Sequence, residues 1–359
     1  MKKVVIITLI ILIILVAIGA ISSIIWYNQQ IKPVNNENIS KTIEISSGTG
    51  TVEIVDLLKE NGLINNALAT KIYIKLNNIK NLQAGKYTLN TSMSVQEILN
   101  QISSGEVLNE QIIITFLEGK NMRWYASKIA EQTNNTEEDV YSLLKDKQYI
   151  SDLIKKYWFL TKDIQNTNIY YPLEGYLYPD TYTFSNADVS VKEIFNILLN
   201  QTDKVLSKYK VQIEQSKYSV HEILTIASIV EMEGKTSSDR KGIASVLYNR
   251  INNNMSLGSD VTTYYAFKVD MGERDLYTNE INTYNPYNTR GPNMEGKLPV
   301  GPISSISEES INATLNPSNS NYLYFVADIN GNIHFTNNYE EHQKIIQELR
   351  KQGLWYEYE

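Results

Sequence analysis

The feature that most constrains this chain is an uncharged, mostly apolar run from Val4 to Trp26, which follows Lys2 and Lys3. About 20 apolar residues span the hydrocarbon core of a bilayer, and a single segment satisfies its backbone hydrogen bonds there as a helix. The alternative is a cleaved secretory signal, whose apolar region is about 7 to 15 residues long and ends at a small-residue cleavage site. Here the apolar run continues past Ser23 to Trp26. We therefore expect an uncleaved transmembrane anchor.

The charges that flank this run predict its orientation. Lys2, Lys3 and the amino terminus lie on the short side, against Lys32 and Lys41 on the other side. Positive charge favours the cytoplasmic side of a membrane. We expect a single-pass protein of the cell membrane with a cytoplasmic amino terminus and an extracytoplasmic remainder. Residues 1–27 are assigned to the cytoplasmic end and anchor, and the polar residues 28–40 to a linker.

Composition disfavours several classes of function. The net charge is -7 with both signs interspersed, whereas nucleic-acid binding requires a basic patch. The chain has no cysteine, which excludes disulfides and thiolate metal sites, and its 3 histidines are too scattered for a metal site. We expect no nucleic-acid partner, no metal and no cofactor. The 25 tyrosines suit a carbohydrate-contacting surface, although ordinary packing explains most tyrosines equally well.

The remaining chain predicts an α+β fold in two parts. Short strand and helix patterns over residues 41–110 predict a small α+β module, and residues 111–352 predict a larger mixed α+β domain. The larger part is mainly helical at first and loop-like from Met255 onward. A buried-type strand is expected at Tyr322–Ala327, paired with Asn332–Thr336 across an Asn-Gly turn.

A capped apolar helix that ends in two carboxylates is the first place to look for chemistry. Ser219 and Glu222 form a capping box, and the apolar residues up to Val230 predict a core helix. Glu231 and Glu233 follow directly. A carboxyl at this rim loses hydration, so its pKa should rise toward neutrality, as a general acid requires. The alternative is a solvated acid that ends a buried helix, and a spacing of about 100° per residue does not choose between the two acids.

Two further segments carry local expectations. A second helix should follow a turn at Gly234–Thr236, with Ser237 or Ser238 as its cap. The aromatic stretch from Glu174 to Phe184 predicts either a sugar-facing surface or a tyrosine-rich packing loop. Residue types alone leave both interpretations open.

Ordered motifs along the chain resemble the MltG (YceG-like) family of endolytic murein transglycosylases. They are EGYLYPDTY at Glu174–Tyr182, ASIVEMEG at Ala227–Gly234, VLYNRI at Val246–Ile251, LGSDVT at Leu257–Thr262, NPYNT at Asn285–Thr289, LPVGPI at Leu298–Ile303, YLYFVAD at Tyr322–Asp328 and EH at Glu341–His342. The resemblance covers nearly the whole chain, and this many motifs in the family's order are specific. It implies that residues 41–110 are a LysM-like subdomain and residues 111–352 the catalytic domain.

The resemblance also implies a reaction. A membrane-anchored lytic transglycosylase would cleave MurNAc-β-1,4-GlcNAc bonds in nascent peptidoglycan strands, leave 1,6-anhydroMurNAc ends and terminate strand elongation. Its partners would be glycan strands, the membrane and peptidoglycan synthases. One carboxyl suffices because the sugar's own C6 hydroxyl replaces the second carboxylate of an ordinary glycosidase. Two alternatives stay open: a non-catalytic peptidoglycan-binding scaffold anchored in the membrane, and a hydrolytic muramidase.

The family's catalytic glutamate matches Glu231, with Glu233 as the fallback. Other motif residues are expected to bind substrate or support the site: Glu174, Tyr182, Asn249, Arg250, Ser259, Asp260, Thr262, Tyr287 and Asn288. The chain departs from the family pattern at Gly258, Val261, Arg290 and Lys297, where glutamine, proline, tyrosine and glycine are usual. These departures affect substrate contacts and loop conformation and leave Glu231 in place.

Overall fold

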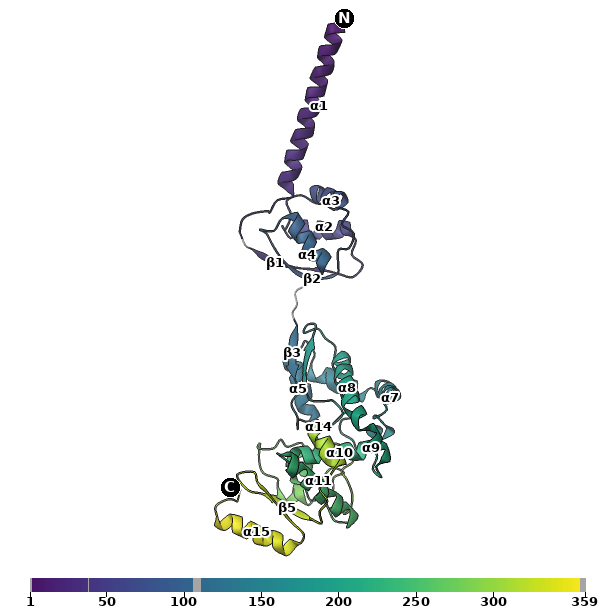
Figure 1. Ribbon diagram of the computed structural model, residues 1–359, viewed down its shortest axis with the longest axis vertical. Helices are drawn as coiled ribbons and strands as arrows, with labels where there is room; N and C mark the ends of the chain where they lie inside the picture. Colours follow the sequence, from purple (N-terminus) through teal and green to yellow (C-terminus); the bar gives the residue numbers. More distant parts are fainter. Residues whose placement is uncertain (1, 38, 106–110, 356–359) are drawn as a thin grey trace. The chain divides into compact units, whose positions relative to one another are not determined.

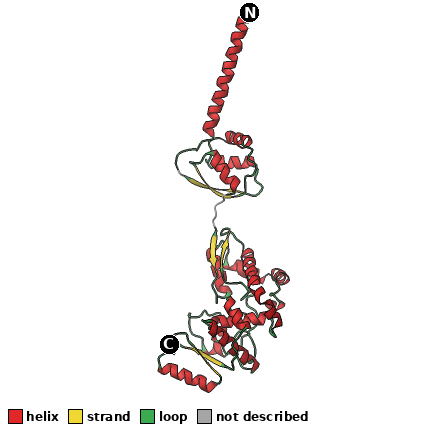
Figure 2. Ribbon diagram, viewed as in Figure 1, coloured by secondary structure: helices red, strands yellow, loops and turns green. Residues whose placement is uncertain are grey.

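The computed structural model describes residues 2–37, 39–105 and 111–355, with side chains from residue 9 onward (Figures 1 and 2). It contains both helices and short antiparallel sheets, so the α+β class expected from the sequence is confirmed. Contacts divide the chain into two compact units, Met1–Glu110 and Gln111–Glu359. Each unit is described by itself.

The first unit begins with the helix predicted from the apolar run. Helix α1 spans Lys2–Gln30, and its Leu9–Gln30 part is long and apolar enough to cross a membrane. Large apolar side chains along it, such as Ile13 and Ile24, are exposed rather than packed against other elements. An apolar surface of this kind is stable in lipid and unfavourable in water.

A small α+β module follows. Strand β1 (Ser40–Ile45) pairs antiparallel with β2 (Gly85–Asn90), and α2 (Thr51–Glu60), α3 (Ala67–Leu76) and α4 (Val95–Ser104) complete the module. Alternate strand residues such as Ile43 and Tyr87 enter the core, as the period of two requires. Part of the segment expected to be a linker lies on this module, because Val34 N and Asn35 N donate to Thr91 O.

The larger unit carries the remaining elements. Its helices are α5 (Met122–Gln132), α6 (Glu137–Lys145), α7 (Lys147–Lys156), α8 (Val191–Leu206), α9 (Lys210–Gln215), α10 (Val220–Glu233), α11 (Ser237–Asn252), α12 (Asp260–Ala266), α13 (Thr278–Ile281), α14 (Glu308–Leu315) and α15 (Tyr339–Lys351), with short 3-10 turns at Lys162–Gln165 and Ser207–Tyr209. Strand β3 (Ile112–Thr115) pairs with β4 (Thr181–Phe184), and β5 (Tyr324–Ala327) pairs with β6 (Ile333–Thr336); both pairs are antiparallel. Helix α15 packs on the β5–β6 hairpin.

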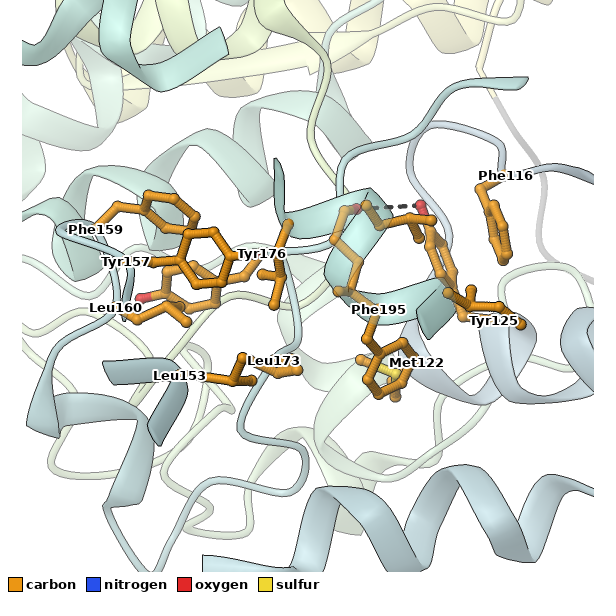
Figure 3. Packing of buried hydrophobic residues seen from close by; sticks show 14 of the residues in the cluster. Phe116, Met122, Tyr125, Leu153, Tyr157, Phe159, Leu160, Leu173, Tyr176 and Phe195 are labelled. Carbon is orange, nitrogen blue, oxygen red and sulfur yellow. Dashed lines mark hydrogen bonds between the residues drawn. The ribbon is translucent and has the colours of Figure 1, made fainter. Parts of the chain in front are cut away.

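An aromatic core fixes the start of α5. Figure 3 shows Phe116 beside Tyr125, whose rings stack with centroids 4.8 Å apart. The Tyr125 hydroxyl donates to the backbone oxygen of Leu177 at 3.3 Å. Tyr176 and Leu177, from the aromatic stretch whose role the sequence left open, are both buried in this core. Burial of this stretch favours its interpretation as a packing loop.

Helix α10 is buried between two cores, which explains its apolar character around most of its circumference. Ile223 and Ala227 pack in the aromatic core of α5 and α8, whereas Ile226 and Ile229 pack in a second core with α11 and α12. The predicted capping box is present, since Ser219 Oγ accepts from Glu222 N and Ser219 N donates to the Glu222 carboxylate. A helix fixed on both sides holds its last turn rigidly.

Three local expectations were wrong. The cap of α11 is Thr236 rather than Ser237 or Ser238, because Thr236 and Asp239 satisfy each other's backbone N–H groups in a capping box. Strand β5 is half-buried rather than fully buried, since it belongs to an isolated two-stranded sheet. The region expected to be loop contains α12, in which tertiary burial of Val261 and Tyr265 overrides weak helix propensity.

Candidate active site

The last turn of α10 presents Glu231 to α11 and α14. Glu231 Oε2 accepts hydrogen bonds from Ser307 N, at 3.0 Å, and from Ser307 Oγ. Glu231 Oε1 accepts from Arg240 Nη2 at 3.2 Å, and the Glu231 side chain is 5% exposed. Ser307 is also the cap of α14, so the carboxyl is fixed by the start of that helix.

Arg240 connects the three helices around this acid. It lies in the first turns of α11, is 8% exposed, and also forms an ion pair with Glu309 in the first turn of α14. Gly234 gives the arginine its space, because a Cβ at Gly234 would lie 2.7 Å from Arg240 Cγ. The orientation of Glu231 therefore depends on Arg240 as well as on α10.

A third carboxyl, which the sequence did not single out, lies near Glu231. Glu118 lies on the loop before α5 and is exposed overall, but partial burial of its carboxyl, followed by the nearby charge of Glu231, raises the pKa of that carboxyl. The next residue, Gly119, has a left-handed φ of 69°, and a Cβ there would lie 4.0 Å from Glu231 Cγ. Ser305 anchors this loop, since its oxygen accepts from Gly119 N at 3.1 Å. The one sequence signal that could have identified Glu118 is its position directly before a glycine, Gly119.

Glu233 has different partners. The Ser259 hydroxyl donates to Glu233 Oε1 at 2.6 Å. Burial raises the pKa of Glu233 to about 7, against the lowering effect of that hydrogen bond. Asp260 raises it further and Arg250 lowers it. The raised carboxyl pKa that the sequence predicts at this rim is therefore found at Glu233.

The motif residues of α11 support loops. Arg250 Nε donates to Leu323 O and its Nη1 donates to Leu257 O, both at 2.6 Å. Asn249 Nδ2 donates to the backbone oxygens of Ser320 and Tyr322 at 2.8 and 3.0 Å. These bonds connect α11 to the segment that leads into β5 and to the loop that carries Ser259. Of the two roles expected for Asn249 and Arg250, the contacts favour support.

Gly258 shows what one departure from the family pattern does. Its φ is 62°, and a Cβ there would lie 2.9 Å from Arg250 Nη1. A glutamine at this position would therefore be strained and would displace the arginine. The exposed Arg290, another departure, pairs with Asp260 at 2.6 Å.

A buried polar network holds Ser259 in place. Thr262 Oγ1 donates to Ser259 O at 2.7 Å, and Ser259 N donates to Thr289 Oγ1 at 3.1 Å. Asn288 is fully buried and accepts from Thr263 Oγ1 at 2.7 Å. Tyr287, also fully buried, packs in the second core. Thr262, Tyr287 and Asn288 thus act as scaffold for the loop beside Glu233.

The structure places Glu174 and Tyr182 inside the protein. Glu174 is 3% exposed and accepts from Met122 N and from the Tyr265 hydroxyl, both at 2.9 Å. Burial raises the pKa of Glu174 to about 7. Tyr182 is 8% exposed, and its hydroxyl donates to Tyr178 O. Both residues support the fold around the site. Among the residues that the structure describes, no group of three or more metal-ligating side chains is arranged to hold a metal ion.

Comparisons with known proteins identify the family. The sequence profile of the YceG-like family matches residues 43–348. An endolytic murein transglycosylase of Bacillus subtilis (strain 168) is 37% identical over 320 residues, which are 88% of this chain and 86% of the relative. One of the same name from Streptococcus pneumoniae serotype 2 (strain D39 / NCTC 7466) is 32% identical over 323 residues, 86% of this chain and 58% of the relative. A 2.6 Å crystal structure of a protein described as yceG-like, from Listeria monocytogenes, has a TM-score of 0.61 and 35% identity and covers 86% of this chain and 100% of that one. This chain belongs to the YceG-like family.

Proposed function

We propose that this chain is a lytic transglycosylase that cleaves MurNAc-β-1,4-GlcNAc bonds within peptidoglycan strands. The relatives named endolytic murein transglycosylase, which match most of this chain, support the reaction class. The single observation that carries the site is the fixed position of Glu231 between Arg240 and Ser307, at the rigid end of α10. A carboxyl held in one orientation is what a positioned general acid requires.

Glu231 acts first as an acid and then as a base in this proposal. Its carboxyl proton passes to the glycosidic oxygen, and the bond from the MurNAc anomeric carbon to that oxygen breaks. The C6 hydroxyl oxygen of the same sugar bonds to the anomeric carbon, and its proton returns to Glu231. No water is consumed, and the enzyme ends as it began. Ser307 and Arg240 orient the Glu231 carboxyl, whereas the Ser259 hydroxyl donates to Glu233 instead.

The membrane anchor and the small module complete the proposal. The length and apolar surface of α1 support an anchor, and the two lysines at its start support a cytoplasmic amino terminus. Residues 28–40 would connect this anchor to a LysM-like module at 41–110 that binds glycan, and residues 111–352 would form the catalytic domain outside the membrane. Cleavage of nascent strands there would terminate their elongation, with peptidoglycan synthases as partners.

The test is mass spectrometry of uncrosslinked glycan strands after digestion by the full chain. We expect fragments that are lighter by one water than hydrolysis products, because the 1,6-anhydro ring closes without the addition of water. Fragments without this difference would refute the transglycosylase reaction. Binding of the strands without any fragments would instead indicate a non-catalytic scaffold.

A hydrolytic muramidase is the second candidate because of Glu118. Hydrolysis needs a second carboxylate to activate water or attack the sugar. Glu118 is close enough to Glu231 for the Glu231 charge to raise its pKa, and it is exposed to solvent. If the products carry the added water, Glu118→Gln should abolish their formation; a fully active Glu118→Gln variant would exclude this role.

A further inference from the structure

A pocket lies beside the last turn of α10, next to the two acids. One wall comes from residues 119–121 and Trp124 at the start of α5, and a second wall comes from α12 and residues 269–271. Met232, which lies between Glu231 and Glu233 in sequence, contributes to the lining. Gly119 lines the pocket as well, and a Cβ there would lie 3.3 Å from Met232 Sδ. The pocket and the acids therefore share one turn of helix.

The wall at the start of α5 is rigid. Asn121 caps this helix by accepting from Trp124 N at 3.1 Å. Met122 and Tyr125 point into the aromatic core (Figure 3), where Tyr125 stacks on Phe116. Trp124 lines the pocket and is half-buried. Its ring is thus held in place by the helix rather than by a mobile loop.

The polar groups of the pocket are also positioned. Asp270 Oδ1 accepts from Arg123 Nη2 at 2.5 Å and from Asn121 Nδ2 at 3.4 Å, so hydrogen bonds join the two walls. The Lys120 ammonium lies 6.0 Å from the centre of the Trp124 ring. A carboxylate, an amide and an ammonium at one rim supply both acceptors and donors.

This combination fits a sugar ring. A pyranose has a face of C–H groups that suits a flat aromatic ring, and hydroxyls at its edge that need donors and acceptors. The exposed Met271, which lines the pocket with Trp124, offers a flexible apolar contact for an acetamido methyl. The carboxylate of Asp270 suits a hydroxyl donor, and Lys120 suits a carbonyl oxygen.

We propose that this pocket is a glycan subsite that binds one N-acetylated aminosugar of the strand, with the Trp124 ring as its stacking surface. The identity of the polymer rests on the proposed function, whereas the stacking role of Trp124 rests on the pocket. Occupation of this subsite places the neighbouring glycosidic bond at the last turn of α10. Trp124 is then a substrate-positioning residue of the cleavage reaction.

Binding separates the subsite from the chemistry. The probe is the β-1,4-linked hexamer of N-acetylglucosamine, titrated by calorimetry into the detergent-solubilised full chain carrying Glu231→Gln. Adding Trp124→Ala should raise the dissociation constant about tenfold or more, which is the scale of one lost ring contact. Adding Met271→Ala should raise the dissociation constant a few-fold. Because Met271 is 55% exposed, this change carries little risk to folding.

Trp158 provides the matched control. It is half-buried in the same unit, and its ring N–H donates to Asp203 rather than facing this pocket. Trp158→Ala in the Glu231→Gln background should bind the hexamer as the parent does. The proposal is overturned if the parent does not bind the hexamer, if neither Trp124→Ala nor Met271→Ala weakens binding, or if Trp158→Ala weakens it as much. Trp124-dependent binding by a chain that releases no glycan fragments would keep the subsite and refute the proposed reaction.

Discussion

The two acids at the end of α10 are two positions apart, yet their surroundings differ in kind. Glu231 is held by the Arg240 guanidinium and by both the backbone N–H and the hydroxyl of Ser307. Glu233 is held by the Ser259 hydroxyl and by burial, which raises its pKa to about 7. Glu174, enclosed in the core, has its pKa raised to the same value. Burial thus raises the pKa of Glu233 and of the enclosed Glu174 alike, so a raised pKa does not by itself identify the catalytic acid.

The largest expected effect comes from exchanging the acids one at a time. Glu231→Gln should lower cleavage of uncrosslinked glycan by about 1,000-fold, because the amide neither donates nor accepts the reacting proton. Glu233→Gln should keep most of the activity, since an amide at this position still accepts from Ser259. Fragment release per unit time is the measurement.

Both variants should still unfold in one cooperative transition, which makes thermal unfolding the control for a folded chain. Gln and Glu have nearly the same volume, and the amide oxygen of Gln still accepts a hydrogen bond. Full activity in Glu231→Gln together with an inactive Glu233→Gln would transfer the catalytic role to Glu233.

Arg240 is the next test of the comparison, because it acts on one acid only. Arg240→Met removes the cation that orients Glu231 and should lower kcat by about 100-fold, the cost of a misplaced catalytic group. It also leaves Glu231 without its charged partner, so unfolding free energy should fall by about 3 kcal/mol. Arg240→Lys keeps the charge and should recover most of the stability, but less of kcat, because lysine lacks the forked geometry.

An unchanged kcat in Arg240→Met would show that Ser307 alone orients Glu231. Chemical denaturation of the same preparations separates the two effects. A loss of stability without a loss of kcat would make Arg240 a purely structural ion-pair partner.

The pH dependence of stability should report the burial of Glu233. The pKa of Glu233 rises from an ordinary 4.5 to about 7 on folding, so the folded state binds the proton more tightly than the unfolded chain. The stability associated with this group is present below pH 4.5 and is lost as pH rises to about 7, by roughly 3 kcal/mol in all. Glu233→Gln should remove this slope, whereas Glu174→Gln should remove the similar slope of its own carboxyl.

Denaturation midpoints measured from pH 4.5 to 7.5 test this expectation. The unmodified chain should lose stability across the window through both groups, and each single variant should lose about half as much. A Glu233→Gln variant with the full slope of the unmodified chain would contradict burial as the cause of the raised pKa.

The sequence predicts the helices around this site, but it does not predict which residues contact the two acids. Capping boxes such as Ser219 with Glu222 are local, so they identify helix starts without knowledge of the fold. Arg240 and Ser307 reach Glu231 from different helices, and Ser259 reaches Glu233 from a loop. No spacing encodes such contacts, because they depend on how α10, α11 and α14 pack.

Residue types also do not predict which side chains are buried. Glu174 lies in a stretch of tyrosines that looks equally suited to sugar contact or to packing, and only its bonds to Met122 N and Tyr265 distinguish the two. Glu118 was missed for the opposite reason. It follows a short strand with no acid partner nearby in sequence, and its relation to Glu231 arises from the loop held by Ser305.

The smallest expected effect probes the exposed charges next to Glu233. Asp260 raises the pKa of Glu233, and Arg290 pairs with Asp260 at 2.6 Å on the surface. Asp260→Asn should therefore lower the pKa of Glu233, and Arg290→Ala should raise it by leaving the Asp260 charge unneutralised. Each change should alter unfolding free energy at neutral pH by less than about 1 kcal/mol, as is usual for exposed ion pairs. The midpoint of the pH-dependent loss of stability should move in opposite directions in the two variants, and high salt should shrink both movements. Movement in the same direction would mean that the two residues act through the conformation of the Ser259 loop rather than through charge, and the contrast between the two acids would then depend on that loop.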